Sequence, residues 1–177
     1  HYPPGVKLVP DFFSGKIVND AAQGKKAKVI TSFSMFYDLE DPVSFAREIE
    51  ASLHDDGIWV FEQSYLPAML MANSFDTICH EHLEFYSLRQ IDWIAEKAGL
   101  KVIDVKFNDI NGGSFSITAA KVDSAIQPDL AQLEKIRADE LALGLNGSQI
   151  YEEFKQRVEE AKNSLMIFLK EALANKK

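Results

Sequence analysis

The residues best suited to chemistry lie together near the middle of the chain, in the segment FDTICHEHLEFYS at positions 75–87. His80, Glu81 and His82 are consecutive there, in a chain that has only four histidines. Histidine changes charge near neutral pH, and an adjacent carboxylate raises its basicity or fixes its tautomer. The segment therefore has the composition of a general-base site. The same composition also suits a polar connecting loop in which the histidines are merely solvated.

A metal site fits this segment poorly. His80 and His82 alternate, so in an extended segment both would point the same way, with Cys79 or Glu84 as further ligands. Catalytic zinc sites, however, take three protein ligands from more than one element. Cys79 is the single cysteine, which excludes a multi-cysteine zinc site and an intrachain disulfide. We therefore expect no metal within this chain.

The composition narrows the function further. The 177 residues include 19 basic and 27 acidic side chains, for a net charge of −8, and 46% are hydrophobic. The hydrophobic share is too high for a disordered chain. The acidic balance argues against nucleic acids and anionic membranes as partners and leaves small molecules and proteins. No apolar run reaches the ~18 residues of a membrane span and no signal peptide opens the chain, so we expect a cytoplasmic protein.

The elements that would position these residues alternate between strands and helices. Short apolar runs predict a strand within 6–13 that ends near Pro10, a buried strand over 27–36 and a strand over 58–61. Helix caps predict a helix from Pro42, capped by Asp41 and stopped by Gly57, and a helix over 87–100 with a Ser87–Gln90 capping box. The turn Asn111-Gly112-Gly113 predicts a hairpin of strands 101–107 and 114–121. This order predicts an α/β fold with a mostly parallel sheet and an antiparallel terminal hairpin.

The composition changes beyond Pro128, where two amphipathic helices are expected. We therefore divide the chain into 1–124, the α/β part, and 125–177, a two-helix extension. The second helix begins near Ser148 and carries a heptad-like apolar stripe from Tyr151 to Ala172. Such a stripe packs either on its own chain or against a second copy.

A glycine-rich nucleotide loop is missing from the α/β part. The nine glycines cannot be assembled into GxGxxG or GxxxxGK[ST], the loops that usually follow the first strand of a doubly wound sheet. We therefore expect the 177 residues to be a piece of a longer protein. A parallel sheet without its first strands has an unpaired edge, so homo-oligomers could form through that edge or through the C-terminal helix.

Five segments together resemble the S-adenosylmethionine-dependent sugar C-methyltransferases, which methylate keto intermediates of nucleotide-linked deoxysugars. They are SFSMFYDLEDP (32–42), GIWVFEQSYL (57–66), FDTICHEHLEFYSL (75–88), GLKVIDV (99–105) and NGGSFSITAAK (111–121). The resemblance implies a partial class I methyltransferase (Rossmann-like) fold, S-adenosylmethionine as cofactor and a nucleotide sugar as substrate. In that family a zinc-binding domain and the glycine-rich loop come before this region and an α/β domain follows it. The resemblance thus implies an internal fragment, with zinc only in the absent N-terminal region.

The resemblance also assigns roles to residues. It makes His82 the general base that removes a proton next to a carbonyl, with Glu81 orienting it, and we expect a hydroxyl of Tyr86 or Tyr37 to donate to the enolate oxygen. The expected site residues that remain are Ser34, Met35 and Phe36 along the cofactor, Asp11 and Phe12 near its adenine, and Cys79, His80, Gly112 and Gly113 near the substrate.

Two departures from the family keep other functions open. The family usually has a tyrosine in place of Cys79 and a histidine near Tyr37, which leaves room for a methyltransferase that acts on another small acceptor. A non-catalytic α/β module that pairs through the helix 148–174 is a third interpretation. Because the glycine-rich loop is missing, we expect this chain alone to bind S-adenosylmethionine weakly or not at all.

Overall fold

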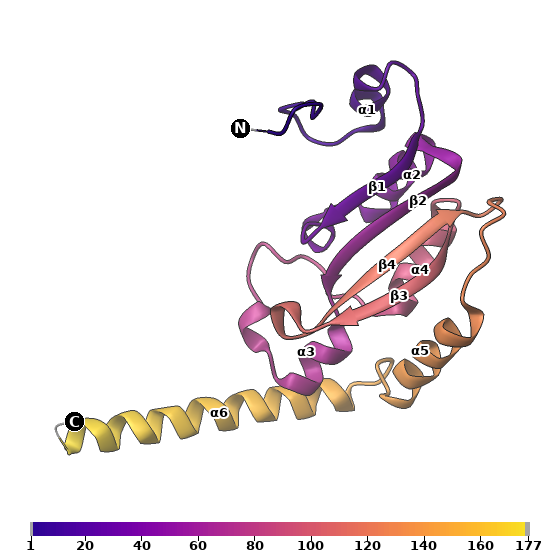
Figure 1. Ribbon diagram of the computed structural model, residues 1–177. Helices are drawn as coiled ribbons and strands as arrows, with labels where there is room; N and C mark the ends of the chain where they lie inside the picture. The colour runs from indigo at the N-terminus through magenta and orange to yellow at the C-terminus, as the bar shows by residue number, and fades with distance from the viewer. Residues whose placement is uncertain (1, 176–177) are drawn as a thin grey trace.

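A four-stranded sheet forms the centre of the molecule in the computed structural model, which describes residues 2–175 (Figure 1). The strand order is β1-β2-β4-β3, with β1 at Ala27–Phe33, β2 at Leu53–Ser64, β3 at Leu100–Asn108 and β4 at Ser114–Lys121. β1 pairs with β2 in parallel, and β4 is antiparallel to both β2 and β3. Three strands therefore run in one direction and β4 alone is reversed, which confirms the predicted fold class.

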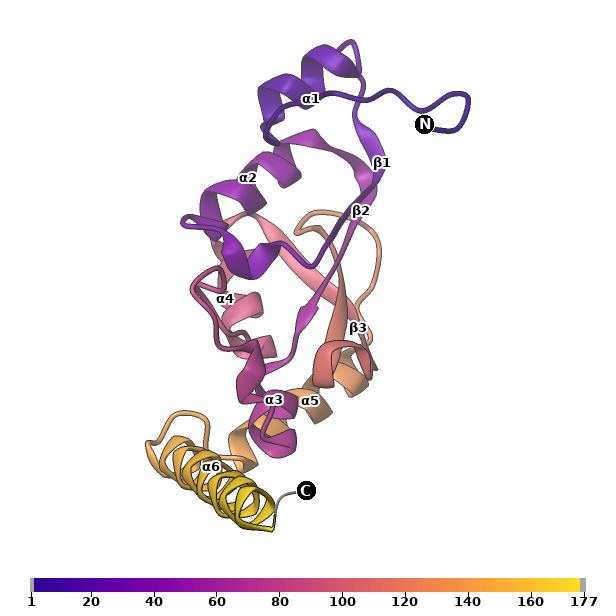
Figure 2. The ribbon, with the colours of Figure 1, turned by 90° about the vertical axis from the view of Figure 1, so that its left-hand side faces the viewer.

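Two helices cover one face of this sheet, as Figure 2 shows: α2 (Pro42–Ser52) and α4 (Leu88–Lys97). α1 (Gly15–Ala21) contacts α2, and α5 (Leu130–Ala142) packs along β3 and α4. α3 (Leu66–Ala72) follows β2 directly, and the first turns of α6 (Gln149–Ala174) pack against it. Three short 3-10 turns complete the connections, at Phe36–Asp38, Phe75–Thr77 and Ile110–Gly112.

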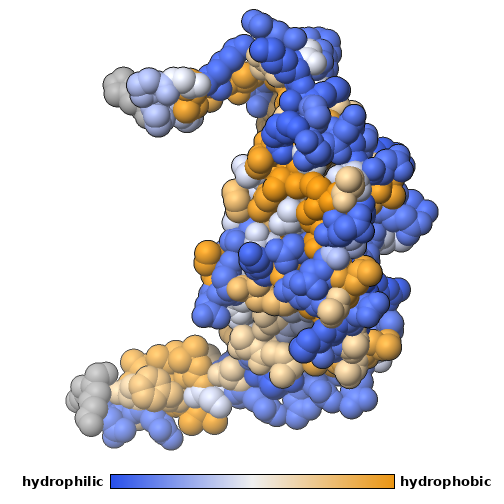
Figure 3. Space-filling view, turned by 45° about the vertical axis from the view of Figure 1, so that its right-hand side comes forward, coloured by the Kyte–Doolittle hydropathy of each residue, from blue (hydrophilic) through white to orange (hydrophobic). Residues whose placement is uncertain are grey.

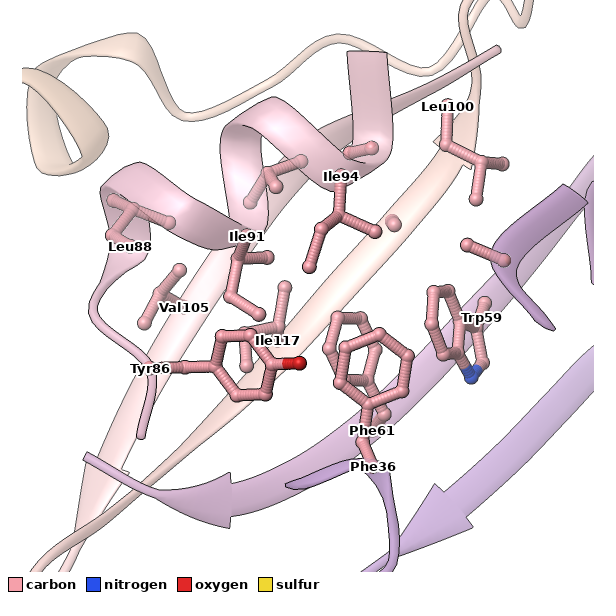
Figure 4. Close-up of a cluster of buried hydrophobic side chains, with 14 of the residues drawn as sticks. Phe36, Trp59, Phe61, Tyr86, Leu88, Ile91, Ile94, Leu100, Val105 and Ile117 are labelled. Atoms are coloured by element: carbon pink, nitrogen blue, oxygen red, sulfur yellow. The ribbon is translucent and has the colours of Figure 1, made fainter. Parts of the chain in front are cut away.

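An aromatic cluster forms the core between β2 and the helices (Figure 4). The rings of Trp59 and Phe61 stack with their centroids 3.8 Å apart, and Phe36 lies 5.2 Å from Phe61 and 5.5 Å from Tyr86. Trp59 and Phe61 share a face of β2 because alternate residues of a strand point the same way. Large aromatic side chains dominate buried area, so this cluster holds the chain segments on either side of it in place.

The local signals in the sequence correspond to real caps and turns. The Asp41 side chain accepts a hydrogen bond from the backbone N of Ser44 at 2.9 Å, and Pro42 opens α2 as expected. At the start of α4 the Gln90 side chain reaches back to the backbone N of Ser87 at 3.1 Å, which completes the predicted capping box. β4 has the predicted bounds, and its antiparallel pairing with β3 confirms the hairpin.

Two predicted elements are wrong. The segment 6–13 contains no strand: Val6, Leu8 and Val9 are exposed, and β2 is the only strand paired with β1 among the described residues. A strand needs a neighbour for its backbone groups, and here the segment has none. Gly57 does not end a helix but lies inside β2, where a Cβ atom would come 2.7 Å from the carbonyl oxygen of Ala27.

The C-terminal extension consists of two helices, as predicted, but the stripe on α6 divides into two parts. Phe154 and Val158 pack against α3, whereas Leu165 and Phe168 are exposed where the helix projects from the body (Figures 1 and 2). None of the helices within residues 2–175 is both long and apolar enough to cross a bilayer.

Candidate active site

The candidate site lies beyond the end of β1, and ligands of open α/β sheets generally bind beyond the carboxyl ends of the parallel strands. β1 stops at Phe33, and Ser34 adopts a left-handed conformation with φ +51° while its backbone N donates to the Glu62 carbonyl oxygen at 2.9 Å. The chain then turns so that Phe36 and Tyr37 are buried. Phe36 enters the aromatic core and thereby anchors the turn that carries Tyr37.

The segment that follows His82 is bound to this turn. The backbone N atoms of Leu83 and Glu84 both donate to the Tyr37 carbonyl oxygen, at 3.0 and 3.2 Å. The imidazole of His82 packs against the Tyr37 ring with the centroids 4.3 Å apart. The structure thus brings together two of the four expected catalytic residues, which come from segments far apart in the sequence.

A backbone carbonyl determines the tautomer of His82. Its Nδ1 lies 2.8 Å from the carbonyl oxygen of Thr77, which can only accept a hydrogen bond. Nδ1 therefore carries the hydrogen, and in the neutral ring Nε2 keeps its lone pair. A half-buried imidazole held this way has the atom that a general base requires.

Glu81 does not make the expected contact with His82. Its carboxylate lies 3.3 Å from Nε2 of His80, and both side chains are exposed, that of His80 by 91%. Glu81 and His80 form a turn on the surface, so the carboxylate faces solvent rather than the imidazole of His82. The orienting partner of His82 is the Thr77 carbonyl instead.

Tyr86 is buried in the core, where its ring packs on Phe36. Burial, with a smaller contribution from Glu84, raises the pKa of its phenol above the ordinary value, so the hydroxyl stays protonated. The hydroxyl points toward Phe36 and Phe61 in Figure 4 and has no hydrogen-bond partner among the described residues. Of the two tyrosines expected to donate to an enolate, only Tyr37 contacts His82.

The residues expected along the cofactor are only partly brought together. Ser34 and the half-buried Met35 lie at the carboxyl end of β1, but the Phe36 side chain is part of the core. Asp11 and Phe12 lie in the N-terminal segment, which extends from α1 away from the sheet (Figure 1), and Phe12 is 92% exposed. Ser34 and Met35 therefore lie beside the candidate site, whereas Asp11 and Phe12 lie in a separate segment, and the cofactor contacts of all four residues stay predictions.

The residues expected near the substrate fall into two groups. Cys79 and His80 are exposed in the loop before His82. Gly112 and Gly113 instead press the β3–β4 turn against Ser74 and Ala68. Among residues 2–175, no three histidine, cysteine or carboxylate side chains lie close enough to hold a metal ion.

Comparison with known proteins identifies the family. The description "Methyltransferase domain" matches residues 7–105. The chain belongs to this methyltransferase family. Residues 109–177 match a second family, described as the C-methyltransferase C-terminal domain.

A curated relative of this methyltransferase chain is the C-methyltransferase NovU of Streptomyces niveus, 29% identical over 176 residues. The match covers 98% of the chain and 41% of NovU, so the chain spans less than half the length of that relative. Solved structures with a distant likeness include a pericyclic reaction enzyme (TM-score 0.47, 15% identity, 55% of this chain and 27% of that one) and the O-methyltransferase NcsB1 from neocarzinostatin biosynthesis (TM-score 0.41, 17% identity, 53% and 28%).

Proposed function

We propose that the chain provides the general base of an S-adenosylmethionine-dependent C-methyltransferase that acts on a nucleotide-linked keto-deoxysugar. The observation that carries the proposal is the His82 imidazole, which donates through Nδ1 to Thr77 and packs on Tyr37 beyond the carboxyl end of β1. The match of residues 109–177 to a C-methyltransferase domain supports carbon rather than oxygen as the acceptor. The sugar substrate rests on the resemblance of the segments around His82 and Gly112.

His82 would make the acceptor carbon nucleophilic. Its Nε2 takes a proton from the carbon next to the carbonyl, and the electrons of that C–H bond form an enolate. The Tyr37 hydroxyl donates a hydrogen bond to the enolate oxygen. When bound, S-adenosylmethionine supplies a methyl group, with the carbon–sulfur bond breaking as the new carbon–carbon bond forms. Ser34 and Met35 would hold one side of it and help to position the two reactants, which supplies much of the acceleration.

We place the other functional parts of the family outside this chain. The glycine-rich loop and a zinc-binding domain would come from preceding segments of a longer protein. The match covers 41% of NovU, which indicates how long that protein would be. We propose that this protein works in the cytoplasm.

The decisive experiment uses the full-length protein and follows deuterium incorporation from solvent into a keto-sugar nucleotide. His82→Ala should lower both exchange and methyl transfer by ~10²–10⁴-fold, the usual contribution of a general base. His54→Ala is the matched control, because His54 is exposed and lies in the first part of β2, away from the carboxyl ends of the strands. Deuterium exchange at the native rate in His82→Ala would contradict the proposal. Exchange with a simple ketone but with no sugar nucleotide would favour another small acceptor.

A second candidate function is pairing between copies of the chain through α6. Figure 3 shows apolar surface on the projecting helix. The exposed apolar side chains along the second half of α6 include Leu165, Ile167, Phe168, Leu169 and Leu173. Sedimentation should then show an association that depends on concentration and is lost in Leu165→Glu/Phe168→Glu. A monomer at all concentrations would exclude this candidate.

A further inference from the structure

We propose that Gly112 is a positioning residue for His82: the β3–β4 turn supports, through Ser74, the short turn whose Thr77 carbonyl holds the imidazole. The catalytic meaning of this support rests on the proposed function of His82, whereas the support itself does not. Gly112 and Thr77 thereby act on the base without contacting substrate.

The first step is a close contact between two turns. Gly112 has φ +79°, and a Cβ atom there would lie 2.6 Å from Ser74 Oγ and 3.3 Å from Ser74 Cβ. Gly113, with φ +123°, meets Ala68 of α3 in the same way. A Cβ atom at Gly112 would turn the Ser74 hydroxyl away, and its contact with Ser74 Cβ would push Ser74 itself by a few tenths of an ångström.

Ser74 cannot move alone, because it is tied at both ends. Its backbone N donates to the Met69 carbonyl oxygen at 3.0 Å, which attaches it to the last turn of α3. On the other side its own carbonyl oxygen accepts from Thr77 Oγ1 at 2.9 Å and from the backbone N of Thr77 at 3.4 Å. Residues 74–77 form a closed turn, so a push on Ser74 displaces Thr77 with it.

The final step is the contact of Thr77 with His82. The carbonyl oxygen of Thr77 receives the Nδ1 hydrogen at 2.8 Å, while the Tyr37 ring limits the imidazole on another side. If this carbonyl moves away, the imidazole loses the acceptor that keeps the hydrogen on Nδ1. Either nitrogen then carries it, and the fraction of molecules with Nε2 free to accept a proton falls.

The chain offers a closely matched control for the test. Gly24 has φ +78°, nearly that of Gly112, but nothing lies within 4 Å of a Cβ atom there. Gly112→Ala and Gly24→Ala therefore introduce the same backbone strain, and only the first pushes on Ser74. Ser74→Gly removes both atoms that meet the added methyl group, so the double variant Gly112→Ala/Ser74→Gly should relieve the push.

The readout is the tautomer of His82 in long-range ¹H–¹⁵N spectra of the chain above pH 8, with its signals identified by their loss in His82→Gln. We expect the native chain and Gly24→Ala to show hydrogen on Nδ1, Gly112→Ala to show a mixture of tautomers, and the double variant to return toward the native pattern. In the full-length enzyme the same Gly112→Ala change should lower kcat and leave KM nearly unchanged.

A native tautomer in a folded Gly112→Ala variant would overturn the proposal, as would a mixture that Ser74→Gly does not relieve. If Gly112→Ala fails to fold, Thr77→Val replaces it, because this change breaks only the bond from Oγ1 to Ser74; an unaltered tautomer in Thr77→Val would also overturn the proposal. The tautomer is measured without substrate. A normal tautomer response together with full activity of His82→Ala would therefore remove the proposed function and leave the positioning role intact.

Discussion

The carboxylate of Glu140 links three parts of the molecule through its hydrogen bonds. Its Oε1 accepts hydrogen bonds from the Tyr65 hydroxyl at 2.9 Å and from the backbone N of Leu88 at 2.6 Å, and its Oε2 accepts from the backbone N of Arg89 at 3.2 Å. The carboxylate comes from α5 and caps the first turn of α4, where negative charge complements the helix dipole. It thereby joins α5, α4 and the residue after β2.

Removing this carboxylate should destabilise the fold strongly. Glu140→Ala leaves two amides and a phenol without their acceptor in a buried place, so we expect a loss of about 2–4 kcal/mol in the free energy of unfolding. Urea denaturation measures it. Glu134→Ala, an exposed carboxylate of the same helix, should cost less than about 0.5 kcal/mol. Equal losses in the two variants would contradict the role of Glu140.

Two tyrosines make stability sensitive to alkali. Burial, and next the charge of Glu140, raises the pKa of Tyr65, and burial with Glu84 raises the pKa of Tyr86. Each phenol thus binds its proton more tightly when folded than in the unfolded chain, where its pKa is about 10. Their contribution is complete below pH ~10 and is lost as pH rises from there toward the folded pKa, by about 1.4 kcal/mol per pH unit for each tyrosine.

Tyr86→Phe should therefore reduce the fall of stability above pH ~10 by about 1.4 kcal/mol per pH unit, as measured by urea denaturation in steps from pH 9 to pH 12. At pH 7 the change should cost little, because the hydroxyl of Tyr86 has no hydrogen-bond partner among residues 2–175. An unchanged slope above pH 10 would mean that this phenol ionises equally well in the folded state.

At the residue scale, the sequence singled out His82 and Tyr37, which lie in contact, but it could not reveal what orients the His82 imidazole. The acceptor for His82 Nδ1 is a backbone carbonyl, which leaves no trace in residue types. Glu81 was the chemically obvious partner, yet the turn at 80–81 directs it to His80. Glu140 gave no signal either, since a glutamate on an amphipathic helix ordinarily indicates a solvated face.

Elements were predictable where the signal lies within a few residues. The cap at Asp41, the box at Ser87 and the turn at Asn111 each bring their own hydrogen-bond groups, so local chemistry decides them. The segment 6–13 shows the limit, because β-branched and aromatic composition does not make a strand without a partner. From its neighbours in the sequence, Gly57 was expected to end a helix, but glycine is required there because the backbone of β1 approaches so closely.

The cap of α2 gives an element-scale prediction. Asp41→Ala removes the acceptor for the backbone N of Ser44 and should lower the free energy of unfolding by about 1 kcal/mol. Asp41→Asn keeps a side-chain oxygen and should remain close to the native value. Thermal and urea denaturation of both variants checks the difference, and an alanine variant as stable as the native chain would show that the cap is dispensable.

At the scale of the whole molecule, α6 should be stable in its first half and labile in its second. Phe154 and Val158 pack on α3, and Arg157 Nη2 donates to the Leu70 carbonyl oxygen at 2.6 Å. The later turns are exposed, and short helices without packing are marginal in water. In hydrogen exchange, amides of 162–174 should exchange at least roughly tenfold faster than those of 153–158. Uniform protection to Leu173 would instead indicate that another surface covers the helix.

The position of β4 has a consequence for how the protein is made. β4 is the last of the four strands within residues 2–175, yet it lies between β2 and β3 and pairs with both of them. On the ribosome, β1 and β2 emerge before β3, and β3 has neither of them as a neighbour in the sheet, which it joins only when β4 follows. The sheet therefore cannot close until Lys121 has left the exit tunnel. A nascent chain stalled before Ser114 would contain the β1–β2 pair and an unpaired β3, both with open strand edges. Chaperones bind such incompletely paired chains.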